Sequence, residues 1–118
     1  MITVLKSKIH RATVTDCNLN YEGSITIDHR LMQVAGILPY EQVHVLDIDN
    51  GVRLITYAQP YTPIWEGSWG RQIIINGAAA KLIKRGHLVI ILSYQMIEPS
   101  QLFKPTIIRV DSENYQIV

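Results

Sequence analysis

Short β-rich apolar runs with turn residues between them recur along the whole chain, and this pattern most limits its fold. Such runs are typical of strands. The chain has 118 residues, which is enough for one hydrophobic core and therefore for a single domain over residues 1–118. The runs predict strands at residues 1–5, 9–14, 25–27, 42–49, 52–58, 71–75, 87–96, 106–110 and 115–118.

The dipeptide Asn50-Gly51 separates two of these runs and predicts a hairpin with a type I′ turn. Asn-Gly is a strong hairpin signal because both central residues of that turn need a positive φ. The segment 59–70 is different, since it holds two prolines together with Trp65 and Trp69. We expect an extended loop there.

Two short helices fit between the strands. Asp28 is expected to cap the first, which has apolar residues on one side and ends at Gly36. The second is predicted over residues 76–84, with a stop at Gly86. Many short strands with two short helices indicate a mainly β fold, a small closed barrel, because closure removes exposed strand edges.

The composition excludes several classes of function. The formal net charge is +1 and no basic run occurs, which argues against a nucleic-acid partner. A single cysteine, Cys17, excludes an internal disulfide and a cysteine-based metal site. The four histidines lack metal-ligand spacing, so we expect no metal. No apolar run is long enough to span a membrane and no signal-like start occurs, so we expect a cytoplasmic protein.

The segment Tyr21-Glu22-Gly23-Ser24 carries the most specific chemistry. A Gly-Ser pair usually marks a turn, but a serine hydroxyl also lies close to the carbonyl carbon before it. Attack on the Gly23 carbonyl would turn the amide into an ester, and elimination would leave dehydroalanine. Hydrolysis would then release ammonia and leave a pyruvoyl group, with the chain cut into residues 1–23 and 24–118.

Several motifs in a fixed order resemble the pyruvoyl-dependent aspartate decarboxylase family, whose members make β-alanine for pantothenate. The resemblance covers about residues 1–112. The motifs are Lys8-Ile9-His10-Arg11, Tyr21-Glu22-Gly23-Ser24, Ala35-Gly36-Ile37-Leu38-Pro39, Asn50-Gly51, Arg53, Thr56-Tyr57-Ala58 and Asn76-Gly77-Ala78-Ala79-Ala80.

The resemblance implies a double-psi β-barrel that assembles as a homotetramer, with active sites between subunits. It also implies a proenzyme that cuts itself between Gly23 and Ser24. Ser24 then becomes the pyruvoyl group, which forms a Schiff base with the substrate, L-aspartate. Part of the family uses a dedicated maturation partner, and nothing in this chain indicates whether it needs one.

The family pattern implies that Tyr57 donates the proton in catalysis. A tyrosine keeps its proton at pH 7 and can protonate the carbon that loses CO₂. The pattern also implies that Arg53 and Lys8 supply positive charge for the substrate carboxylates. An arginine suits a carboxylate that must be held, but which of the two residues holds which carboxylate stays open.

Thr56 and the segment Gly77-Ala78-Ala79 are implied to contact the substrate. The first N–H groups of a helix lack internal partners and favour negative charge. Asn76 is expected either to cap that helix or to orient a substrate group. Thr56 is a further candidate to stabilise the oxyanion of self-cleavage.

Two departures from the family pattern leave alternatives open. The longer connection with Trp65 and Trp69 is expected to cover the site or to contact another subunit. Leu46 stands where some relatives have tryptophan. The alternatives are decarboxylation of another amino acid such as glutamate, an uncut barrel that serves as a binding module, and a serine hydrolase. No nucleophile-elbow pattern surrounds Ser24 to support the last.

Overall fold

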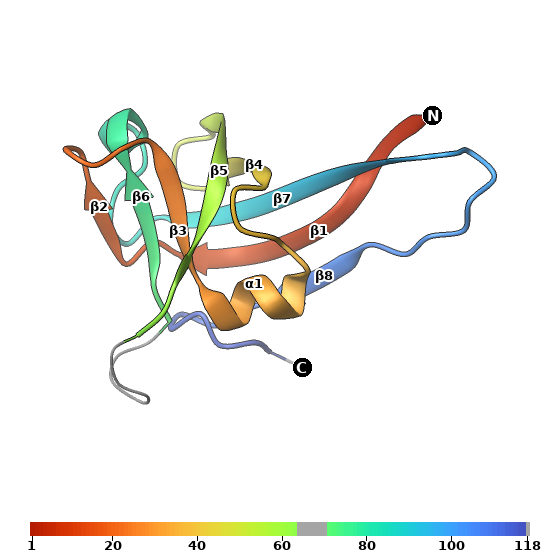
Figure 1. Ribbon diagram of the computed structural model, residues 1–118. Coiled ribbons are helices and arrows are strands. Elements are labelled where there is room, and N and C mark those ends of the chain that lie inside the picture. Colours follow the sequence, from red (N-terminus) through yellow and green to blue (C-terminus); the bar gives the residue numbers. More distant parts are fainter. Residues whose placement is uncertain (64–70, 118) are drawn as a thin grey trace.

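The computed structural model, which describes residues 1–63 and 71–117, has a mainly β fold with two short helical segments (Figure 1). Within these described ranges, eight strands form one sheet in the order β2-β6-β3-β5-β4-β7-β1-β8. The mainly β prediction is confirmed. The strands are β1 (Ile2–Thr13), β2 (Asp16–Asn18), β3 (Ser24–Asp28), β4 (Gln42–Asp47), β5 (Arg53–Tyr61), β6 (Ile73–Asn76), β7 (Leu88–Ile97) and β8 (Thr106–Arg109).

The hydrophobic core lies on one side of the curved sheet. Alternate side chains of each strand point to this side, because successive residues of a strand face opposite ways. Among the described residues no ladder joins β2 to β8, the two ends of the strand order. The sheet is compatible with the predicted small barrel. The fully buried strand residues include Ile9, Ile25, Ile27, Val43, Val45, Ile73, Val89 and Ile91.

The predicted strands at residues 1–5 and 9–14 are one strand, β1. Its pairing with β7 shifts register between Leu5 and Ser7 and again between Ile9 and Ala12. Such irregularities bend a strand without ending it, so the polar residues 6–8 continue the strand instead of forming a turn. Figure 1 shows β1 and β7 as a long ribbon that projects beyond the rest of the sheet.

The first predicted helix is present as α1 (His29–Ala35), between β3 and β4. The Asp28 carboxylate accepts a hydrogen bond from the Arg30 backbone N–H, and Gly36 ends the helix at a φ of 75°. Burial alone would raise the pKa of Asp28, but hydrogen bonds from Arg30 outweigh it and lower this pKa. No helix among the described residues is long and apolar enough to cross a membrane.

The hairpin between β4 and β5 is confirmed, but the type I′ turn is wrong. Only Gly51 has a positive φ, of 76°, and Asn50 does not. The loop is wider because side chains hold it: Asp47 Oδ1 accepts the Asp49 N–H at 2.8 Å, and Asn50 Oδ1 accepts the Val52 N–H at 2.9 Å.

The second helix is shorter than predicted, a 3-10 helix η1 (Gly77–Lys81). Its expected cap, Asn76, makes no capping hydrogen bond because its side chain is engaged elsewhere. Residues 59–61 belong to β5 instead of the predicted loop, while Trp65 and Trp69 lie outside the described residues. Near the C-terminus, the described part of the predicted strand at 115–118, residues 115–117, forms one bridge, between Val110 and Gln116.

Candidate active site

Ser24 begins β3, between β5 and β6, and is only 2% exposed. Its partner across the antiparallel ladder to β6 is Asn76. On the other side, Ile25 pairs with Ala58 of β5, so the parallel register brings Tyr57 beside Ser24. Tyr57 and Asn76, which both lie more than 30 residues after Ser24 in the sequence, therefore flank it in the sheet.

The Asn76 side chain holds the Ser24 hydroxyl. Its Nδ2 donates to Ser24 Oγ at 3.0 Å and to Thr26 Oγ1 at 2.9 Å. Ser24 Oγ in turn donates to the Glu22 carbonyl over 3.4 Å, a long contact. The amide therefore fixes the hydroxyl oxygen next to the Gly23–Ser24 peptide bond.

Gly77 lies against the residue that precedes Ser24. It has a φ of +74°, and a Cβ added there would lie 2.7 Å from Gly23 Cα. Gly23 itself has no positive φ, and a Cβ added to it would meet nothing within 4 Å. The close approach to the main chain therefore occurs at Gly77 and not at Gly23.

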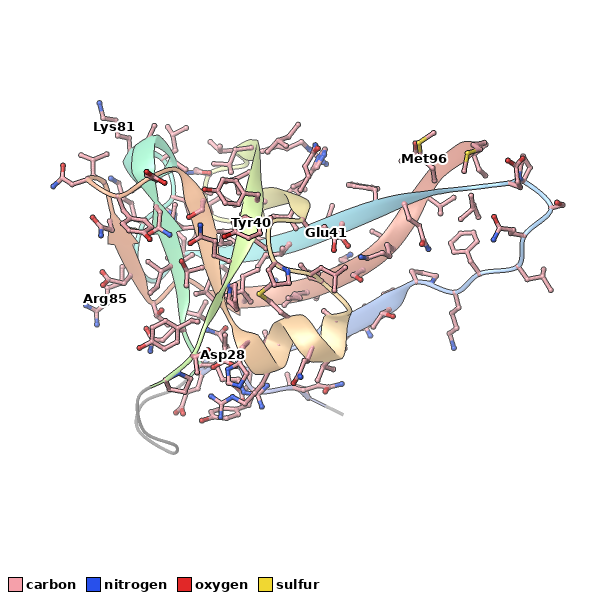
Figure 2. The ribbon with its side chains drawn as sticks, in the orientation of Figure 1. Asp28, Tyr40, Glu41, Lys81, Arg85 and Met96 are labelled. Carbon is pink, nitrogen blue, oxygen red and sulfur yellow. The ribbon has the colours of Figure 1, made fainter. Side chains whose placement is uncertain are left out.

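Tyr57 shares the outer face of the sheet with Ser24, because Ile25 and Ala58 beside them are fully buried on the inner face. The Tyr57 hydroxyl accepts a hydrogen bond from Gln59 Nε2 at 3.5 Å, and the ring stacks on Tyr40 with centroids 6.2 Å apart. In the view of Figure 2, Tyr40 lies between Lys81, which belongs to η1 beyond β6, and Asp28, which ends β3.

Thr56 faces the other way. It pairs with buried Val43 and alternates with Tyr57, so its side chain points to the inner face of β5. Within the described part of the chain, no side-chain hydrogen bond joins Thr56 to Ser24. After Gly77, Ala78 is exposed and Ala79 is half-buried, so Ala78 is open to a small molecule.

Lys8 and Arg53 lie on the outer face of another part of the sheet. Lys8, Leu92, His44 and Ile55 form one row across β1, β7, β4 and β5. Arg53 Nη1 contacts His44 Nδ1 at 3.2 Å. Three strand spacings of about 4.8 Å place Lys8 about 14 Å from Ile55, so the structure does not gather these two cations around Ser24 within one chain.

His10 follows on the same strand as Lys8. Its Nδ1 is buried and has no hydrogen-bond partner among the described residues. Burial, followed by the positive charges of Lys8, Arg11 and Arg109, lowers the pKa of His10. The lowered pKa favours the neutral form of the His10 imidazole.

One polar cluster, formed by Asp47, Asp49 and His87, has no local signal in the sequence. Ligand atoms of all three lie within 4.8 Å of one another. His87 Nδ1 contacts Asp47 Oδ2 at 2.6 Å, and Asp49 Oδ2 accepts the Leu88 N–H at 2.8 Å. These contacts tie the β4–β5 hairpin to the start of β7, and the expectation of no metal stays a prediction.

Together, the fold and site define a small mainly β protein in which an amide side chain holds a serine hydroxyl beside a Gly–Ser peptide bond. The model of the family described as aspartate decarboxylase matches residues 1–117. The chain belongs to this family.

Relatives named aspartate 1-decarboxylase align with nearly the whole chain. The relative from Dehalococcoides mccartyi is 52% identical over 114 residues, which are 94% of this chain and 87% of that protein. The relative from Thermoanaerobacter pseudethanolicus is 53% identical over 94% of this chain and 92% of its own. The relative from Clostridium botulinum is 50% identical over 96% of this chain and 87% of its own length.

Proposed function

We propose that the protein cuts itself between Gly23 and Ser24 and then decarboxylates L-aspartate to β-alanine and CO₂, which supplies pantothenate synthesis. The observation that carries the proposal is the Ser24 hydroxyl, held by Asn76 at 3.0 Å beside Tyr57 in a chain of this family. The proposed products are residues 1–23 and residues 24–118.

Self-cleavage needs a serine hydroxyl beside the preceding carbonyl. Ser24 Oγ attacks the Gly23 carbonyl carbon, the peptide C–N bond breaks, and an ester links the two residues. Loss of the Ser24 α-proton and of the Gly23 carboxylate gives dehydroalanine at the new N-terminus. Water then replaces the nitrogen, which leaves as ammonia. Thr56 stays our candidate to stabilise the oxyanion of the first step, although its side chain faces the inner side of β5 here.

The surroundings of Ser24 fit a covalent pyruvoyl group made from it. The residue is buried at a strand end, and the Asn76 amide lies beside its side chain, 3.0 Å from the Oγ that later leaves with the Gly23 carboxylate. A pyruvoyl group supplies an electron-accepting carbonyl, in the place of a bound cofactor. Tyr57 provides the proton that must reach the substrate carbon after CO₂ leaves, and Gln59 keeps its hydroxyl oriented.

The remaining substrate contacts support a site completed by a second copy of the chain. We assign the substrate carboxylates to Arg53 and Lys8, and further contacts to Asn76 and the Gly77–Ala79 segment. Arg53 lies four residues from Tyr57 along β5, so their Cα atoms are about 13 Å apart. This separation is longer than an aspartate molecule. Lys8 lies farther across the sheet.

The outer face that carries these cations supports the homotetramer. Ile55 is 60% exposed and Met96 is 61% exposed on this face. Met96 also borders a hollow of about 410 Å³, which is lined by Thr3, Gln42, His44, Tyr94, Gln95 and Met96. Covering this apolar face with another subunit removes it from water and brings a second copy's Arg53 or Lys8 to Ser24.

The direct test incubates purified protein with L-aspartate and, separately, with L-glutamate. We expect β-alanine from aspartate and little decarboxylation of glutamate. The Ser24→Ala variant serves as the control and should form no product. Product from glutamate alone would replace the substrate assignment, and an active Ser24→Ala variant would reject the mechanism. Light scattering on the same sample tests the homotetramer.

A further inference from the structure

We propose that Gly77 is a positioning residue for self-cleavage: without a side chain, the backbone at residue 77 lies against Gly23 and holds the peptide bond that Ser24 attacks. This inference rests on the proposed self-cleavage. The residue that must lack a side chain is then Gly77, which is far from the cut in sequence, and not Gly23 at the cut.

The three atoms nearest to a Cβ built at Gly77 are all main-chain atoms. A Cβ at residue 77 would lie 2.7 Å from Gly23 Cα, 2.9 Å from Gly23 N and 3.2 Å from Tyr21 O. Carbon atoms do not approach this closely, and a main chain cannot rotate away as a flexible side chain does. Any residue other than glycine at position 77 therefore displaces Gly23.

Asn76 and Gly77 together contact both reacting partners. Asn76 Nδ2 holds the attacking oxygen, Ser24 Oγ, at 3.0 Å. Gly77 packs on Gly23, which bears the carbonyl under attack. Two consecutive residues therefore set the relative position of nucleophile and carbonyl, and a displacement of about 1 Å in such a pair costs about 100-fold in rate.

The segment before the cut can move without unfolding the sheet. Leu19 is 49% exposed and Tyr21 is 52% exposed, and residues 19–23, which follow β2, are all exposed. A side chain at position 77 therefore pushes this exposed segment aside instead of breaking the core. We expect a large loss of cleavage rate with a small loss of stability.

The chain offers a matched control in Gly51. Its φ is +76°, against +74° at Gly77, but a Cβ at Gly51 would meet nothing within 4 Å. Gly77→Ala and Gly51→Ala therefore carry the same backbone penalty, and only the first adds the contact with Gly23. Gly77→Asn is the second variant, because asparagine tolerates a positive φ better than alanine but still carries a Cβ.

The experiment follows the cut fraction of each freshly purified full-length chain by intact mass. We expect Gly77→Ala and Gly77→Asn to cut about 100-fold more slowly than wild type, and Gly51→Ala to stay within about threefold of it. In a Ser24→Ala background, which cannot form the ester, the unfolding midpoints of Gly77→Ala and Gly51→Ala should fall by similar amounts.

Hydroxylamine identifies the impaired step, because it captures an ester at Gly23. We expect it not to restore cutting of Gly77→Ala, since the ester itself forms slowly. Rescue by hydroxylamine, cutting at the Gly51→Ala rate, or a midpoint loss much larger than that of Gly51→Ala would each overturn the positioning role. An uncut wild-type chain would reject both self-cleavage and the positioning role of Gly77. If the wild-type chain is cut and the Gly77→Ala chain is cut equally fast, only the positioning role is rejected.

Discussion

Asn76 lies 52 residues after Ser24, yet its side-chain amide donates to the Ser24 hydroxyl at 3.0 Å and to Thr26 at 2.9 Å. Adjacent strands bring the two residues together, because Ser24 and Asn76 are direct partners in the β3–β6 ladder. The residue expected to cap a helix or to orient substrate therefore holds the proposed nucleophile.

Replacing Asn76 with alanine should slow self-cleavage. The hydroxyl would lose the donor that fixes its oxygen, and one such hydrogen bond contributes about 1 kcal/mol, which corresponds to about a five- to tenfold change in rate. Intact mass over time measures the effect. Thr26→Val is the control, since it removes the second acceptor and keeps the contact with Ser24. Equal cutting by Asn76→Ala and wild type would contradict the assignment.

Tyr57→Phe should cut itself normally but lose at least about 100-fold in turnover, the usual contribution of a general acid. The measurement compares β-alanine production with the cut fraction of the same sample. Tyr40→Phe is the matched control, because it keeps the stacked ring and removes a hydroxyl that our account does not use. Full turnover by Tyr57→Phe would mean that another acid, or water, protonates the carbon.

Much of the fold could be predicted from the sequence because its signals are local. The apolar runs located the strands, and Asp28 and Gly36 marked the two ends of α1. The errors have two causes. The polar residues 6–8 stay in β1 because of a tertiary contact, since β7 pairs along both halves of that strand. The β4–β5 loop is widened by local hydrogen bonds, in which the side chains of Asp47 and Asn50 each accept a backbone N–H two residues on.

The site was predicted less completely. The family resemblance named Ser24, Tyr57 and Asn76, but the contact between Asn76 and Ser24 depends on strand register, which the sequence does not reveal. The approach of Gly77 to Gly23 depends on the direction in which the chain leaves β6. Neither contact has a local sequence signature.

Asn114 should be a major source of stability. It is fully buried, has a φ of 66°, and its side chain makes three hydrogen bonds to the main chain of Thr13 and Arg71. Asn114→Gly keeps the backbone conformation and should cost about 2 kcal/mol of unfolding free energy.

Asn114→Ala should cost about 1 kcal/mol more than Asn114→Gly, because alanine resists a positive φ. Urea unfolding at one protein concentration, in the Ser24→Ala background so that every sample is a single chain, measures both values. The exposed Gln116→Ala serves as the control. A loss below about 0.5 kcal/mol for Asn114→Gly would contradict the role, since that is the range of ordinary surface changes.

Asp28 should make stability depend on pH below about pH 4. Although burial opposes it, the hydrogen bonds and positive charge of Arg30 lower its folded-state pKa below the usual range of an aspartate. Its charge therefore contributes stability above the unfolded-state pKa, and this is lost as the pH falls through the folded-state pKa. Asp28→Asn keeps a good helix cap and should flatten the fall in unfolding free energy between pH 5 and pH 2. Parallel curves for the two proteins would contradict the assignment.

The intact mass of the purified wild-type protein tests the central claim most directly, with Ser24→Ala beside it. Our account predicts two chains, residues 1–23 and 24–118, with the second lighter by one ammonia than simple hydrolysis would leave it, and a single uncut chain for Ser24→Ala. A single wild-type mass for residues 1–118 that persists on prolonged warming, or two chains ending in an intact Ser24, would contradict it.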